Sequence, residues 1–94
     1  MAWTDSPTPL QLGALRKMSK NLKRRFDIRT IDAVLLTIKD RREASEALES
    51  IRAIRVHENT GYYSPRNRRL LDEAIANSKF YQQLINADKA LFDE

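Results

Sequence analysis

A capped, amphipathic stretch in the middle of the chain, residues 40–56, constrains the fold more than any other feature of the sequence. Asp40 and Glu43 have the spacing of a capping box, in which each side chain accepts a hydrogen bond from the other residue's amide. Apolar residues then recur every three or four positions, on one helical face: Ala44, Ala47, Leu48, Ile51 and Ile54. The stretch therefore predicts a helix whose apolar stripe the rest of the chain must cover.

A second helix is predicted near the N-terminus. Thr8 is a good N-cap, Pro9 suits the first helical position, and Gln11 completes a capping box. We expect this helix to run to about residue 26, with an apolar stripe made of Leu12, Leu15, Met18, Leu22 and Phe26. Residues 1–7 are expected to form a flexible arm.

The most apolar run of the chain lies between these two helices. Residues 27–29 read as a short connection, after which Thr30 could cap a segment over 31–39. Its composition alone also suits a buried strand. A single strand without a partner cannot satisfy its backbone hydrogen bonds, and no partner run exists, so we predict a short buried helix.

The C-terminal part begins with a turn and ends in helix. Residues 57–61 should end the central helix, since Asn59 or Gly61 adopts a left-handed conformation at little cost. Ser64 and Pro65 then form another cap and first helical position. Helical spacing continues to about residue 90, either as one helix or with a break near Asn77 and Ser78; we favour the break.

These elements predict a single all-α domain, a compact bundle of four or five helices. The chain has 94 residues, enough for one small core. It has no cysteine and no apolar run of membrane-spanning length, so we expect a cytoplasmic protein without disulfides or thiolate metal sites. The predicted core comprises Leu15, Met18, Leu22, Val34, Leu35, Ile38, Leu48, Ile51, Ile54, Leu71, Ile75 and Leu84.

Positive charge is concentrated in the first part of the chain. The net charge is +4, but residues 1–42 carry +6 and residues 43–94 carry −2. A first basic cluster lies on the outer face of the predicted N-terminal helix: Arg16, Lys17, Lys20, Lys23, Arg24 and Arg25. Such a cluster predicts a polyanion or an acidic protein surface as partner. The alternative is a solvated face that complements the helix dipole and is partly neutralised by Glu46 and Glu49.

A second basic cluster, Arg66, Arg68 and Arg69, follows the adjacent Tyr62 and Tyr63. Cations in the first turn of a helix oppose its dipole, so an anion would offset them. Tyrosines beside arginines can stack bases and hold phosphates. The alternative is that the tyrosines pack on the core and the arginines pair with Asp72, Glu73 or the C-terminal acids.

No catalytic or metal-binding pattern is present in the sequence. His57 is the only histidine and no glycine-rich phosphate loop occurs. The carboxylates of residues 43–49 lie beside Arg42, Arg52 and Arg55, as on a salt-bridged surface rather than in a catalytic pocket. We therefore expect no catalysis, no cofactor and no metal.

Two stretches resemble a SAP-like or UBA-like helical mini-domain that is appended to phage and bacterial nucleic-acid enzymes. The first comprises Thr8, Pro9, Leu10, Gln11, Leu12, Leu15, Arg16 and Lys17, and the second Arg41, Arg42, Glu43, Ala44, Ser45, Leu48 and Ile51. The resemblance covers about residues 8–55. It implies an accessory domain that binds nucleic acid or docks on a protein, without catalysis.

The sequence thus predicts a small binding protein that contacts nucleic-acid phosphates through the first basic cluster, with the second cluster as a further patch. Phosphate contacts carry little sequence information, so we expect weak discrimination between DNA or RNA sequences. The competing hypothesis is a protein-interaction module, such as a phage-type inhibitor or adaptor, whose basic faces dock on an acidic protein surface.

Overall fold

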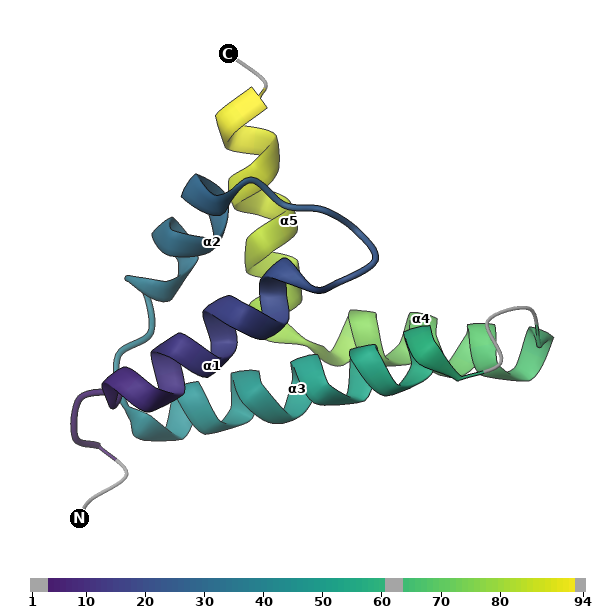
Figure 1. Cartoon of the computed structure of the whole chain (residues 1–94), viewed down its shortest axis with the longest axis horizontal. Helices are drawn as coiled ribbons and strands as arrows, with labels where there is room; N and C mark the ends of the chain where they lie inside the picture. Colours follow the sequence, from purple (N-terminus) through teal and green to yellow (C-terminus); the bar gives the residue numbers. More distant parts are fainter. Residues whose placement is uncertain (1–3, 61–63, 93–94) are drawn as a thin grey trace.

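The structure is a computed structural model that describes residues 4–60 and 64–92. Within these residues it contains helices and no strand, which confirms the predicted all-α bundle (Figure 1). There are five helices in the described chain: α1 (Pro9–Lys20), α2 (Ile28–Leu35), α3 (Arg41–Asn59), α4 (Pro65–Asn77) and α5 (Lys79–Phe92). None of these helices is both long enough and apolar enough to cross a membrane.

The bundle is flat rather than spherical. Its principal extents are 40 × 38 × 19 Å, and the shortest is about two helix diameters. α1 runs alongside α3 in the same direction, and α4 turns back along α3 (Figure 1). α5 leaves the end of α4 and packs against α2, which also contacts α1. The longest helix, α3, therefore contacts α1, α4 and α5 and organises the fold.

The predicted starts of α1 and α3 are confirmed by their caps. At α1, the Thr8 hydroxyl accepts from the Gln11 amide at 3.1 Å, and the Gln11 side chain accepts from the Thr8 amide at 3.0 Å. At α3, Asp40 accepts from the Glu43 amide at 2.9 Å. The Glu43 carboxylate reaches back one residue further than expected, to the amide of Lys39 at 2.9 Å.

The predicted end of the N-terminal helix is wrong. α1 stops at Lys20 rather than near residue 26. The Asn21 amide donates to the carbonyls of Met18 and Ser19 in the last turn, and the Arg25 guanidinium donates to the Lys20 carbonyl. Leu22 and Phe26 are nevertheless buried, since the loop over 21–27 folds back onto the core.

The predicted bounds of the next helix are also wrong. Asp27, not Thr30, is the N-cap of α2, and it accepts from the Arg29 amide at 2.8 Å. The Thr30 hydroxyl instead donates to Asp88 of α5 at 3.4 Å. The helix ends at Leu35, so Leu36 projects into solvent.

The core lies where α1, α2, α3 and α5 meet. Every predicted core residue is either buried or packed against the buried cluster. Phe80 is buried as well, although it was not assigned to the predicted core. Four buried polar residues were not predicted at all: Ser19, Thr30, Glu58 and Ser78.

α4 differs from the other helices because none of its residues is buried. The predicted break between α4 and α5 is confirmed at Ser78, whose hydroxyl donates to Ser50 at 2.8 Å and accepts from the Tyr81 amide at 3.1 Å. At the other end of α4, the Asn67 side chain donates to the His57 carbonyl at 2.7 Å. α4 is thus fastened to α3 at both ends.

The N-terminal segment meets α3 at its start. The carbonyl of Asp5 accepts from the Arg41 amide at 2.9 Å, and the carbonyl of Ser6 accepts from the Arg41 guanidinium at 3.3 Å. These two residues belong to the arm that was expected to be flexible; residues 1–3 of that arm lie outside the described residues.

Candidate nucleic-acid interface

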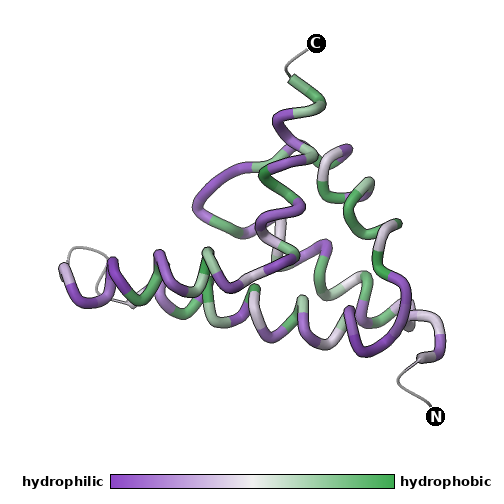
Figure 2. The backbone as a smooth tube through the Cα atoms, turned by 180° about the vertical axis from the view of Figure 1, so that it is seen from behind, coloured by the Kyte–Doolittle hydropathy of each residue, from purple (hydrophilic) through white to green (hydrophobic). Residues whose placement is uncertain are grey.

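The first basic cluster spans a helix and a loop rather than one helical face. Because α1 ends at Lys20, the helix carries Arg16, Lys17 and Lys20, whereas the other three cations lie in the loop that follows. All six residues are exposed. Figure 2 shows that this loop is hydrophilic over most of its length.

Two cations of the first basic cluster have acidic partners on other helices. Arg16 pairs with Asp32 of α2 at 2.9 Å, and Arg24 approaches Asp88 of α5 to 3.9 Å. Glu46, which the alternative expected to neutralise part of the cluster, pairs with Arg42 within α3 at 3.5 Å. Exposed pairs such as these stabilise a fold by about 1 kcal/mol or less, so they leave the arginines available to a stronger anion.

Lys17 and Lys20 form no ion pair with any described acidic residue. They line a shallow hollow on α1, the α1 hollow, together with Gly13, Arg16 and Asn21. No acidic side chain lines it. An added Cβ on Gly13 would meet nothing within 4 Å, so Gly13 faces this open surface and does not admit a neighbouring helix.

The loop that carries the remaining cations is held to the core. The Lys23 amide donates to both carboxylate oxygens of Glu58 on α3, at 3.2 and 3.3 Å. The ring of Phe26 meets Tyr81 of α5 edge-on at 5.6 Å between centroids, and the Arg24 guanidinium lies 5.0 Å from the Phe26 centroid. These contacts give the loop cations fixed positions beside α1.

Glu58 is the buried acid at the base of this loop. Burial raises the pKa of its carboxyl above the ordinary value, while the hydrogen bond from the Lys23 amide acts in the opposite direction. Its carboxylate accepts from the Lys23 amide of the loop, and the positive charges of Lys23 and Arg55 also act to lower its pKa.

The second basic cluster is displayed separately. Arg66, Arg68 and Arg69 are exposed at the start of α4 and form no ion pair with a described acid, Asp72 and Glu73 included. α1 and α4 do not contact each other; each packs against α3. Tyr62 and Tyr63, which were expected to accompany this cluster, lie outside the described residues.

Two further cations, Arg52 and Arg55 of α3, were not assigned to a site from the sequence. We read them as part of a salt-bridged surface with residues 43–49, but neither pairs with a described acid. They line a second hollow, the α3 hollow, with Val56, Asn59 and Thr60. Their spacing of three residues was the available signal, since it places both on one side of the helix.

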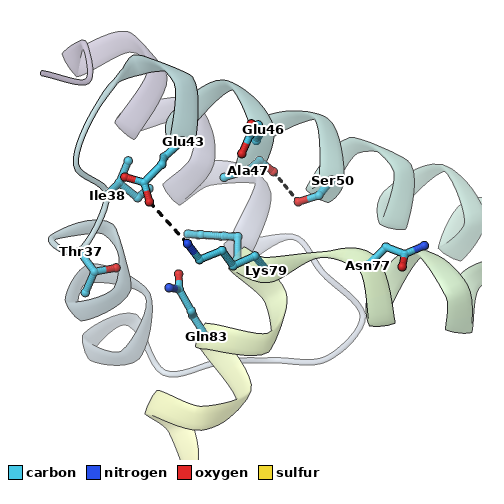
Figure 3. A pocket seen from close by; sticks show the side chains of 10 residues that line it. Thr37, Ile38, Glu43, Glu46, Ala47, Ser50, Asn77, Lys79 and Gln83 are labelled. Atoms are coloured by element: carbon cyan, nitrogen blue, oxygen red, sulfur yellow. Dashed lines mark hydrogen bonds and ion pairs between the residues drawn. The ribbon is translucent and has the colours of Figure 1, made fainter. Parts of the chain in front are cut away.

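Another hollow opens between α3 and α5, next to the turn after α2 (Figure 3). Glu43 and Lys79 face each other across it, with 3.7 Å between carboxylate and ammonium. Both charges are thereby engaged in an ion pair. In the part of the chain that the structure describes, no group of three or more His, Asp and Glu residues is arranged to hold a metal.

His57 has a structural position at the end of α3. Its Nδ1 lies 3.3 Å from the Asn67 side-chain oxygen, and its carbonyl accepts from the same side chain.

Comparison with protein-family models, with curated proteins and with solved structures found no match for this chain.

Proposed function

We propose that this protein binds the phosphate backbone of nucleic acid, without catalysis, through α1 and the loop after it. The contacts come from Lys17, Lys20, Lys23, Arg24 and Arg25. One observation carries the proposal: the α1 hollow is lined by cations, and Lys17 and Lys20 have no acidic partner among the described residues. A phosphate placed there meets positive charge that the fold itself leaves uncompensated.

The anchoring of the loop supports this proposal. Lysines and arginines bind a polyanion mainly by releasing its counterions, and this mode needs cations arrayed on a surface rather than a deep pocket. The hydrogen bonds from Lys23 to Glu58 and the ring contact of Phe26 keep the loop cations in such an array. Because phosphates are common to all sequences, we expect little sequence preference.

The distribution of exposed apolar residues favours nucleic acid over an acidic protein as partner. Protein interfaces are usually built around a desolvated apolar or aromatic centre. Here the exposed large apolar side chains of the described chain each come from a different element: Leu10, Leu36, Val56, Leu70 and Phe92. The protein-docking hypothesis is therefore the outcome to test against.

The test is a titration of the protein with single-stranded and duplex DNA and RNA at about 50 and 200 mM salt. Direct phosphate binding should weaken steeply with salt. The logarithm of the binding constant should fall with the logarithm of the salt concentration, with a slope near −0.9 per phosphate contact on duplex DNA. Lys17→Gln/Lys20→Gln should lower the affinity about tenfold or more at the lower salt and reduce the slope by about 1–2.

Lys39→Gln/Lys89→Gln is the matched control, since it removes the same charge from exposed lysines outside the proposed face. It should change the affinity far less. Absence of binding to any of the nucleic acids at low salt would refute the proposal and leave docking on an acidic protein as the surviving hypothesis.

A further inference from the structure

The α3 hollow is a second place where cations gather without acids. Arg52 and Arg55 line it with Val56, Asn59 and Thr60, so its polar groups are two guanidinium groups, an amide and a hydroxyl. We infer that the hollow is a second phosphate subsite, and that the nucleic acid crosses from α1 onto α3. This inference rests on the proposed function and extends it to residues outside the first basic cluster.

The α3 hollow lies on the side of α3 that faces away from α4. Ser50 and His57 mark the α4 side, because they bond to Ser78 and Asn67 at the two ends of that helix. A helix turns about 100° per residue, so positions two residues away point about 200° from these markers. Arg52 and Arg55 are such positions, and they lie on the opposite side from α4.

α1 is the neighbour of α3 that carries the first basic cluster. It packs against α3 and has no contact with α4, and Figure 1 shows α1 along the first part of α3 and α4 along its last part. Packed helices lie about 8–10 Å apart. The α1 hollow and the α3 hollow are therefore on neighbouring helices, whereas the second basic cluster is on α4.

The two hollows are also at a similar level along the helices. Near the start of both α1 and α3, the Gln11 side chain donates to the carbonyl of Arg41, which is 30 residues later in the sequence. Towards the end, the Lys23 amide meets Glu58, an offset of 35 residues. Between these contacts, Arg52 and Arg55 fall beside the last turn of α1 and the start of the loop. A sugar-phosphate backbone bound at Lys17 and Lys20 would therefore have α3 as its neighbour.

A purely structural role does not account for these arginines. Basic residues complement the helix dipole within the last turn, and the basic residue in the last turn of α3 is His57. Arg52 and Arg55 lie before that turn, and neither forms an ion pair with a described acid, although the charge of Arg55 acts on the buried Glu58. In addition, the Nε of Arg55 is shielded from solvent and has no hydrogen-bond acceptor in the described structure.

The experiment compares Arg52→Gln/Arg55→Gln with Arg66→Gln/Arg68→Gln in titrations with a single-stranded and a duplex oligonucleotide at several salt concentrations. Both double variants remove two arginine charges, so an effect of net charge alone is equal in the two. The α3 variant should lose affinity by roughly ten- to a hundredfold at low salt, with a slope reduced by about 1–2, and the α4 variant should lose much less. Arg52→Gln alone, at an exposed position, should show about half the change in slope.

The outcomes separate the inference from the proposed function. If wild type binds and Lys17→Gln/Lys20→Gln weakens it, but the α3 and α4 variants behave alike, the subsite on α3 is refuted and the proposed function stands. If wild type shows no salt-dependent binding, both fail. If Arg52→Gln/Arg55→Gln unfolds, the single variant decides: an unchanged salt slope for Arg52→Gln overturns the inference.

Discussion

The two basic clusters of this protein are presented in different ways. The first lies on α1 and on a loop whose residues Leu22 and Phe26 are part of the buried core. The second lies on α4, a helix without a single buried residue. The two clusters thus differ in how much the segment that carries them contributes to the buried core.

The difference teaches which cluster can act as a preorganised site. The loop cations are held by a hydrogen-bonded carboxylate and an edge-on ring pair, so their ordering is already achieved by folding. The arginines of α4 sit on a helix fastened to α3 by a half-buried strip and by contacts at its ends. We expect that ordering them around a ligand costs more conformational entropy.

The largest expected effect comes from removing the ring that holds the loop. Phe26→Ala should lower the free energy of unfolding by about 3–5 kcal/mol, because a buried aromatic side chain is replaced by a cavity. Leu70→Ala on α4 is the comparison; that side chain is 39% exposed, and its loss should cost about 1 kcal/mol or less. Urea denaturation measures both, and similar losses would show that the two clusters are held equally.

A smaller effect is expected at Gly13, in the α1 hollow. Gly13→Ala should raise the free energy of unfolding by about 0.4–1 kcal/mol, since alanine favours the helix and the added methyl group meets no neighbour within 4 Å. Urea denaturation again gives the value. A destabilised variant would mean that the exposed face of α1 is more crowded than described.

The smallest expected effect is a pH trend at Glu58. Burial raises its folded-state pKa, so its contribution to stability is complete below the ordinary value of 4.5 and declines as the pH rises through the folded pKa. Glu58→Gln keeps an acceptor for the Lys23 amide but does not titrate. Its free energy of unfolding relative to wild type should therefore improve between about pH 4 and pH 7. A difference that is constant over this range would contradict the assigned burial.

Sequence reasoning predicted the starts of α1 and α3 but neither the start of α2 nor the ends of α1 and α2. Starts depend on local caps, such as Thr8 with Gln11 and Asp40 with Glu43, which a single stretch of sequence contains. The end of α1 at Lys20 could not be read in this way, because Leu22 and Phe26 continue the apolar spacing while lying in a loop. Tertiary packing rather than helical periodicity buries them.

The candidate site was predictable only in part. The clustering of cations around residues 16–25 was visible in the sequence, but their acidic partners were not, since Asp32 and Asp88 come from helices that only the fold brings close. The tether from Lys23 to Glu58 joins residues 35 positions apart. Arg52 and Arg55 were assigned to a salt-bridged surface because acids lie near them in sequence, although the structure pairs them with none of the described acids.

The most direct test of the binding face is an amide chemical-shift map of the protein titrated with an oligonucleotide at low salt. The account predicts that the largest shifts fall on residues 16–25 and 52–56, with little change at the start of α4. Shifts concentrated on residues 66–69, or no shifts at any oligonucleotide concentration, would contradict it.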